Sequence, residues 1–217
     1  MHPALDPIAD LSKFISSVPS HVDWSKISLY CCLVSISASP LVWNVVGRNE
    51  YRNKTLTRLV GPHVGCGFLG VSIFLAGLYR DVLYKIALHD QPKYPLPYEV
   101  QTIIAWIIFG AGNFLVATSF IALGFYGTYL GDYFGILLKK RVTQFPFNVL
   151  NDPMYVGSTM CFVGASLWYE RPVGLLISVY VTWTYYVALR YEGPFTDMIY
   201  NHTELAAKSN NQINCMT

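Results

Sequence analysis

Apolar residues gather in five stretches of this chain that contain no Asp, Glu, Lys or Arg: residues 28–47, 59–79, 102–131, 153–169 and 172–189. A helix needs about 20 residues to cross the hydrocarbon core of a bilayer. The second and third stretches meet that length, and the fourth and fifth are short for a span. The first contains Pro40 and Asn44, and it either spans the membrane or lies within one leaflet.

The stretches should be helices, because every backbone polar group in lipid needs an internal hydrogen-bond partner. No alternating pattern typical of strands competes with this interpretation. Only Glu170 and Arg171 separate the last two stretches, and Pro172 suits the first turn of a helix, so we predict a tight helical hairpin. The fold class is therefore all-α, a polytopic integral membrane helical bundle with four to five membrane-embedded helices.

We expect a single domain over residues 1–217, with a polar N-terminal segment at 1–27 and a flexible polar tail at 203–217. Basic residues predict its orientation, because cytosolic loops of membrane proteins are rich in Lys and Arg. The first loop carries Arg48, Arg52, Lys54 and Arg58, and the third carries Lys139, Lys140 and Arg141. Both are cytosolic if the first stretch spans, which leaves residues 80–100 outside and the C-terminus in the cytosol.

Composition supports the membrane class, since 53% of the residues are hydrophobic and only 13% are charged, about half the charged fraction of a soluble domain. A net charge of +2, with no basic run longer than residues 139–141, gives no reason to expect a nucleic-acid partner. The five cysteines show no C-x-x-C spacing. They predict neither a zinc site nor a disulfide framework.

Asp132 is the candidate catalytic residue. It follows the long uncharged stretch 102–131 and precedes the basic residues 139–141, so it lies where a span meets water and lipid headgroups. An ionisable residue close to hydrocarbon is costly, and a functional site is its default explanation. The alternative is a structural one, in which Asp132 caps a helix or pairs with Lys139 or Arg141.

Four segments carry a resemblance to the phosphatidylethanolamine N-methyltransferase family. They are Ala122-Leu-Gly-Phe-Tyr-Gly-Thr-Tyr-Leu-Gly-Asp-Tyr-Phe-Gly-Ile-Leu, Arg141-Val-Thr-Gln-Phe-Pro-Phe-Asn, Asn151-Asp-Pro-Met-Tyr-Val-Gly-Ser-Thr and Tyr191-Glu-Gly-Pro-Phe-Thr. With Pro40-Leu-Val-Trp-Asn-Val-Val, the likeness runs from about residue 30 to residue 200. The Arg80-Asp-Val-Leu-Tyr segment resembles the fungal phospholipid methyltransferases, which complete phosphatidylcholine synthesis.

The resemblance implies a membrane methyltransferase domain that moves methyl groups from S-adenosylmethionine to a phospholipid amine. It implies a multi-pass protein of the endoplasmic reticulum membrane, with the mitochondrial membrane as a second location. The family's Gly-x-Gly cofactor element falls on Gly110, Ala111 and Gly112, and its acidic pair falls on Glu192 and Gly193. Glycine stands here where the family has a second Glu, which puts a second carboxylate in doubt.

Each of these residues also has a structural explanation. Gly-x-Gly within a span is ordinarily a place of close helix packing, and Glu192 could be a helix-terminal charge beside Arg190. In the functional interpretation, Glu192 faces the sulfonium or binds the ribose hydroxyls or ammonium of the cofactor. Asp132, its pKa raised by desolvation, accepts the proton of the substrate ammonium.

Two further groups of residues could meet the ligands. Aromatic faces attract sulfonium and methylated ammonium groups, and basic side chains suit a lipid phosphate. The aromatic group is Tyr126, Tyr129, Tyr133, Phe134 and Tyr155, with a membrane-interface belt as the alternative, and the basic group is Lys139, Lys140 and Arg141.

The sequence leaves other functions open. Asp152-Pro-Met-Tyr-Val-Gly has a looser likeness to the isoprenylcysteine-type carboxyl methyltransferases, whose carboxylate nucleophile needs no base. A non-catalytic membrane scaffold has the same spans. A transporter is disfavoured, because the ionisable residues gather at the ends of the stretches.

Overall fold

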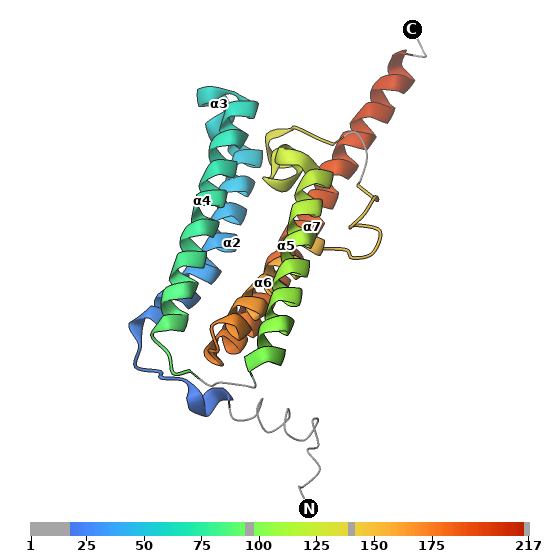
Figure 1. The fold of residues 1–217 in the computed structure, drawn as a ribbon. Coiled ribbons are helices and arrows are strands. Elements are labelled where there is room, and N and C mark those ends of the chain that lie inside the picture. Colours follow the sequence, from blue (N-terminus) through green and yellow to red (C-terminus); the bar gives the residue numbers. More distant parts are fainter. Residues whose placement is uncertain (1–17, 94–97, 139–141, 215–217) are drawn as a thin grey trace, which may run out of the picture. The chain divides into compact units, whose positions relative to one another are not determined.

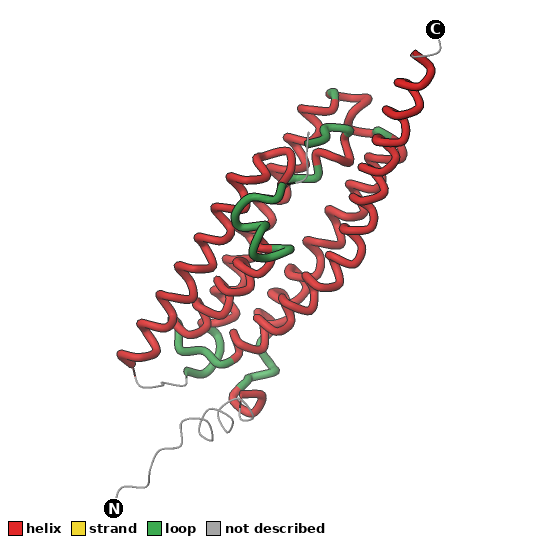
Figure 2. Tube along the Cα trace, turned by 90° about the vertical axis from the view of Figure 1, so that its right-hand side faces the viewer, coloured by secondary structure: helices red, strands yellow, loops and turns green. Residues whose placement is uncertain are grey.

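The computed structural model describes residues 18–93, 98–138 and 142–214. Along the chain run η1 (Val18–His21), α2 (Ile27–Asn53), α3 (Thr55–Val60), α4 (Pro62–His89), α5 (Tyr98–Thr128), η2 (Gly131–Phe134), α6 (Pro153–Trp168) and α7 (Val173–Asn214) (Figure 1). Within these described residues there are helices and loops and no strand, as Figure 2 shows in red and green. The all-α prediction is confirmed.

Four segments are long and apolar enough to cross a membrane: Ile27–Asn53, Pro62–His89, Gln101–Phe134 and Val173–His202. The first stretch therefore has the length and composition of a span, rather than only those of a half-leaflet helix. The fourth stretch forms α6, which has 16 residues and a length of roughly 24 Å at 1.5 Å per residue. The predicted hairpin is present, with α6 ending at Trp168 and α7 beginning at Val173.

The helices extend beyond the uncharged stretches, because a charged residue at the end of a span does not break a helix. α2 passes through Arg48 and Glu50, and α4 passes through Arg80 and Asp81. The last stretch was expected to end at residue 189, but α7 passes through Pro194 and continues to Asn214, into the expected tail. Hydropathy thus located the helices and underestimated their length.

The third stretch is not one straight helix. Gly124 has φ 65° and ψ −179°, which interrupts α5 near its end. Leu130 then adopts a left-handed conformation with φ 58°, and the chain turns into η2. Glycine tolerates the positive φ at position 124. As a result, Asp132 lies in the short turn η2, at the end of the apolar segment Gln101–Phe134, instead of on a continuous helix.

The described chain forms two compact units, and the long helices contribute to both. The first unit collects residues up to 36, 80–116 and 152–182. Within it, the buried Tyr84 hydroxyl donates to the Phe162 carbonyl over 2.8 Å, and the two rings lie 4.5 Å apart. Trp106 and Trp168 pack edge to face at 4.9 Å.

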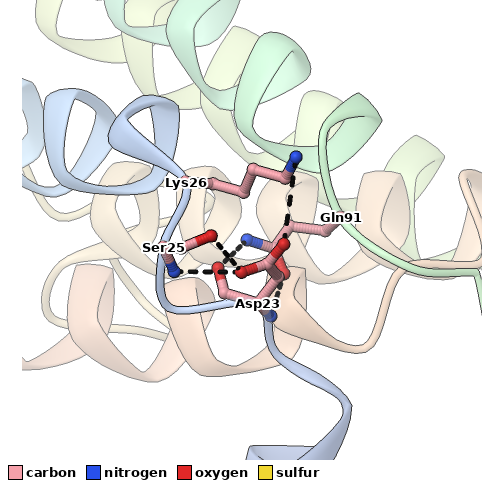
Figure 3. A network of polar contacts seen from close by, with 4 residues as sticks. All are labelled: Asp23, Ser25, Lys26 and Gln91. Atoms are coloured by element: carbon pink, nitrogen blue, oxygen red, sulfur yellow. Dashed lines mark hydrogen bonds and ion pairs between the residues drawn. The ribbon is translucent and has the colours of Figure 1, made fainter.

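A polar network joins the start of α2 to the end of α4 within the first unit (Figure 3). The Gln91 side chain accepts from the Asp23 backbone N–H over 2.8 Å and donates to the Asp23 carbonyl over 2.8 Å. The Asp23 carboxylate accepts from the Ser25 backbone N–H at 3.0 Å and from its hydroxyl at 2.6 Å. These two bonds lower the pKa of Asp23 below its ordinary value. The network fixes the entry of the chain into α2.

The second unit collects residues 37–79, 117–151 and 183–217. Its apolar core contains Cys66, Leu69, Tyr133, Phe134 and Ile199. Glu50 is only 1% exposed. Its carboxylate accepts from the backbone N–H groups of Leu56 and Thr57 over 2.7 and 2.9 Å. Glu50 therefore satisfies the free amides at the start of α3 and holds the turn between α2 and α4.

Candidate functional site

Glu192 is held by two donors from α2 in the second unit. The Trp43 indole N–H donates to Glu192 Oε1 over 2.5 Å, and the Asn44 side-chain amide donates to the same oxygen over 2.8 Å. The Asn44 amide also donates to the carbonyl of Pro40 over 2.9 Å, which fixes its orientation. The carboxylate thus lies against α2, where these two of its contacts are neutral donors. Arg190 contacts the hydroxyl of Tyr186.

Arg48 lies one helical turn beyond Asn44 on α2. Its guanidinium donates to the Tyr191 carbonyl over 2.7 Å, and it lies 4.7 Å from the ring centroid of Phe195 and 5.8 Å from that of Tyr191. The Phe195 ring packs in turn against Tyr133 at 5.0 Å. A guanidinium on aromatic faces is stabilised by the cation–π attraction, so Arg48 is held beside the residue that precedes Glu192.

Asp132 belongs to the same unit and contacts α7. Thr196 donates its hydroxyl proton to Asp132 Oδ2 over 3.1 Å. The N-cap position of η2 is Leu130, whose side chain makes no capping hydrogen bond. The Asp132 carboxylate itself accepts from the backbone N–H groups of Asp132 and Tyr133, so the capping alternative stays open. The other alternative involved Lys139 or Arg141, and both lie outside the described residues.

Three buried polar atoms in this region have no hydrogen-bond partner among the described residues. They are Asn44 Oδ1, Arg48 Nε and the Tyr133 hydroxyl. Most buried polar atoms in proteins are paired, so three orphans in one region indicate a place where a ligand supplies the partners. We call these residues and their neighbours the α2–α7 cluster: Trp43, Asn44, Arg48, Asp132, Tyr133, Glu192 and Thr196.

Gly110, Ala111 and Gly112 lie in the first unit, whereas Asp132, Glu192 and Gly193 lie in the second. Gly112 is buried where α5 meets α6: a Cβ there would lie 2.6 Å from the carbonyl oxygen of Gly157. Close packing of α5 on α6 therefore explains why glycine stands at position 112. Gly110 is exposed, and a Cβ there would meet nothing within 4 Å, so packing does not account for it.

The predicted aromatic group is divided between different environments. Tyr133 and Phe134 belong to the core of the second unit. Tyr126 and Tyr129 pack against Phe125 with centroid distances of 5.6 and 5.0 Å, and Tyr155 lies in the first unit. Only Tyr133 joins the α2–α7 cluster. The basic group at residues 139–141 lies outside the described residues.

Sequence reasoning missed the partners of the two carboxylates. Trp43 and Asn44 were visible within the segment Pro40-Leu-Val-Trp-Asn-Val-Val, but nothing in the pattern linked them to Glu192, which is 149 and 148 residues away. Arg48 was interpreted only as a signal of orientation. A polar Asn in an otherwise apolar span was the clue that could have been followed further.

Comparison of the sequence with known proteins shows the family of this chain. A model of the phospholipid methyltransferase family matches residues 100–203. A Neurospora crassa protein named phosphatidyl-N-methylethanolamine N-methyltransferase is 48% identical over 196 residues, which cover 89% of this chain and 88% of the relative. The chain belongs to the phospholipid methyltransferase family.

Other relatives support this family. The Saccharomyces cerevisiae protein of the same name is 42% identical over 201 residues, covering 92% of this chain and 98% of the relative. Human phosphatidylethanolamine N-methyltransferase is 43% identical over 182 residues, covering 83% and 92%. No solved structure matches the chain.

Family membership makes the chain a multi-pass membrane enzyme, and it decides against the scaffold and the transporter. These relatives are named for a phospholipid amine and not for a prenylated carboxylate, which also disfavours the isoprenylcysteine-type alternative. Phospholipid methyltransferases of this family take the methyl group from S-adenosylmethionine. The α2–α7 cluster fits that cofactor, because its carboxylate, its guanidinium and its three orphaned atoms complement a ligand rich in hydroxyl, ammonium and carboxylate groups.

Proposed function

We propose that the chain N-methylates mono- and dimethylated phosphatidylethanolamine to form phosphatidylcholine, with the unmethylated lipid as a poorer substrate. The observation that carries this substrate choice is the likeness to fungal proteins named phosphatidyl-N-methylethanolamine N-methyltransferase, at 48% and 42% identity over most of both chains. We assign the reaction to the second unit, where the α2–α7 cluster lies.

The proposed catalytic residue is Asp132. When bound, S-adenosylmethionine supplies an electrophilic methyl group on a positively charged sulfur. A protonated amine has no lone pair, so the Asp132 carboxylate first takes the ammonium proton of the lipid. Removal of that proton by Asp132 would free the nitrogen lone pair to attack the methyl group, with the sulfur of the cofactor as the leaving group. Thr196, through its 3.1 Å hydrogen bond, holds the carboxylate in place.

Glu192 is the proposed cofactor-binding residue, with Gly193 allowing close approach of backbone beside it. Trp43 and Asn44 keep the Glu192 carboxylate in one position before the ligand arrives, which lowers the ordering cost of binding. For Gly110, Ala111 and Gly112, the proposal is narrower. Their cofactor-binding role rests on the family resemblance alone. Gly110 leaves open space at its Cβ position, and Gly112 lets α5 approach α6.

The test uses the purified full-length chain in lipid vesicles with radiolabelled S-adenosylmethionine. Separate vesicles offer phosphatidylethanolamine, its monomethyl form, its dimethyl form or a prenylated cysteine peptide as the acceptor. We expect label in phosphatidylcholine from the dimethyl acceptor and less label from the unmethylated lipid. Label in a methyl ester of the peptide, with none in phospholipid, would overturn the proposed substrate.

We also propose the endoplasmic reticulum membrane as the location, with the mitochondrial membrane as a second one, and a cytosolic position for the second unit. The second unit contains the basic residues Arg52, Lys54 and Arg58, which follow Arg48 of the α2–α7 cluster in the sequence. Positive residues favour the cytosolic face, which is also where a soluble cofactor would reach the enzyme.

A further inference from the structure

The orphaned atoms of the α2–α7 cluster are of two kinds. Asn44 Oδ1 is an acceptor with no partner among the described residues, and it lies beside the Glu192 carboxylate that its own amide contacts. Arg48 Nε is a donor with no such partner, and the Tyr133 hydroxyl can also donate. The cluster therefore presents acceptors at Asn44 and Glu192, and donors at Arg48 and Tyr133.

The two kinds of group lie close together. Asn44 and Arg48 are four residues apart on α2, which is a rise of about 6 Å along one face of a helix. Across from them, Glu192 contacts Asn44, and the neighbouring carbonyl of Tyr191 contacts Arg48. A negative and a positive site thus stand one helical turn apart, each fixed to both α2 and α7.

This pattern complements an α-amino acid, in which an ammonium and a carboxylate are attached to the same carbon. We propose that the α2–α7 cluster binds the amino-acid end of S-adenosylmethionine, with Glu192 and Asn44 Oδ1 accepting from the ammonium and Arg48 donating to the carboxylate. The inference rests on the proposed function. It assigns Arg48 a role in cofactor binding and selects the ammonium from the roles open to Glu192.

The lipid headgroup is the competing occupant, because it also joins an ammonium to an anion, here a phosphate. Its ammonium must lose a proton to react, and each methylation removes one N–H donor. A binding site with two fixed acceptors, here Asn44 Oδ1 and the Glu192 carboxylate, binds a primary ammonium best. Such a site would hold the substrate amine in its unreactive protonated form. The ammonium of the cofactor keeps its three N–H donors throughout the reaction. The observations therefore favour the cofactor.

The experiment compares two ligands that differ in this end of the molecule. S-adenosylhomocysteine has the amino-acid group, and 5′-methylthioadenosine lacks it. Their affinities are measured by calorimetry for the full-length protein in detergent and for Arg48→Met. Arg52→Met, an exposed position one turn further along α2, is the matched control for loss of a positive charge.

We expect Arg48→Met to lower the affinity for S-adenosylhomocysteine roughly 10- to 100-fold, the range for one charge-assisted hydrogen bond. Binding of 5′-methylthioadenosine should stay unchanged, which also shows that the variant is folded. The control should match the parent for both ligands. If Arg48→Met does not fold, Arg48→Lys replaces it, because Lys keeps the charge and loses the planar fork. Arg48→Lys should lower only the affinity for S-adenosylhomocysteine.

Three results would overturn the inference. In the first, Arg48→Met binds both ligands equally more weakly, which would indicate a structural role for Arg48. In the second, Arg48→Met binds both ligands as tightly as the parent does. The Michaelis constant for lipid could rise while affinity for S-adenosylhomocysteine is kept, which would place the lipid phosphate at Arg48. Failure of the proposed function is a different result, in which the unaltered protein neither binds S-adenosylhomocysteine nor labels phospholipid.

Discussion

Asp132 is the residue on which the proposed chemistry depends most. Asp132→Asn keeps the shape of the side chain and removes its ability to take a proton. We expect both ligands to bind and methyl transfer to slow roughly 100-fold or more, the usual range for a lost general base. Raising the pH from 7 to 10 should partly restore the rate, because more of the lipid amine then arrives neutral. Turnover per folded molecule, measured over that range, checks this.

A purely structural role for Asp132 has a different signature. Loss of the Thr196 hydrogen bond would then lower the folded fraction, while the remaining molecules would turn over normally with no special response to pH. Thr196→Val is the companion variant, since it removes the same bond and leaves the carboxylate. Normal turnover in folded Asp132→Asn would remove Asp132 from the mechanism.

Glu192→Gln tests the cofactor side of the site. The amide keeps a carbonyl acceptor for Trp43 and Asn44 but loses the negative charge. We expect binding of S-adenosylmethionine to weaken by about 1–3 kcal/mol, as for one charge-assisted hydrogen bond. The Michaelis constant for lipid should change little. A change in the lipid constant alone would move Glu192 from the cofactor to the lipid.

At the scale of single residues, the sequence supplied the two carboxylates but not their surroundings. Asp132 stood out because it ends a long uncharged stretch, and Glu192 stood out through the family resemblance. Arg48 looked like one of several basic loop residues, because its contact with Tyr191 bridges 143 positions of the chain. Contacts between distant elements leave no periodic mark in a single sequence.

Helix packing separates the two glycines of the Gly-x-Gly element. A side chain at Gly110 meets no neighbour within 4 Å, whereas one at Gly112 collides with backbone of α6. We expect Gly110→Leu to fold normally and to weaken S-adenosylmethionine binding. Gly112→Leu should lose stability by about 1–3 kcal/mol or more, the cost of overpacking. Thermal unfolding and calorimetry on both variants distinguish the two effects.

Unchanged cofactor binding in folded Gly110→Leu would remove the Gly-x-Gly element from the cofactor site. Gly67→Leu is a matched control, since this glycine also lies in a span and has nothing within 4 Å of its Cβ position. It should affect neither stability nor binding.

The entry into α2 should respond to acid through Asp23. Hydrogen bonds from Ser25 hold the pKa of Asp23 below its ordinary value, so the ionised carboxylate favours the folded state. This contribution is present above the ordinary pKa of 3.8 and is lost as the pH falls through the lowered one. The parent should therefore have a higher Tm than Asp23→Ala at pH 6. The gap should shrink as the pH falls below that ordinary value and through the lowered one, and a constant gap would contradict the assignment.

At the scale of elements, hydropathy predicted where helices occur and misjudged where they end. α4 continues past Arg80 and Asp81, because charged residues at the end of a span do not break a helix. The two side chains contact each other over 2.8 Å, and the Arg80 guanidinium lies 5.1 Å from the Phe162 ring. The break at Gly124 was not predicted, since a lone glycine in a span has several possible explanations. Only the backbone angles identify its role.

Topology gives a prediction for the whole molecule. The sequons Asn53-Lys54-Thr55 and Asn201-His202-Thr203 both fall in the second unit, for which we propose a cytosolic position. Neither should be glycosylated in a eukaryotic host, because glycans are added only on the lumenal side. A sequon introduced at residues 90–92, within the first unit, should be modified. Gel mobility before and after glycosidase treatment measures this, and a glycan on Asn53 would reverse the orientation.

For the molecule as a whole, composition and uncharged stretches predicted the membrane class and the all-α fold, because a bilayer permits few alternatives. The grouping into two units was not predictable from hydropathy, which describes each helix alone. The single-domain prediction stays a prediction, since the long helices run through both units. The methyltransferase reaction was predicted from the family resemblance, because the hydropathy pattern carries no information about the reaction.

The contact between Gly112 and Gly157 limits which second mutations can restore function after a change at either position. A Cβ on either glycine would lie 2.6 Å from the carbonyl oxygen of the other. A harmful change at one position therefore cannot be rescued by a smaller residue at its partner, because the partner is already the smallest residue and the obstacle is main chain. In a growth selection, revertants of a Gly112 allele should restore glycine at that codon or map to Cys161, whose sulfur would lie 2.9 Å from the new Cβ, and none should arise at codon 157.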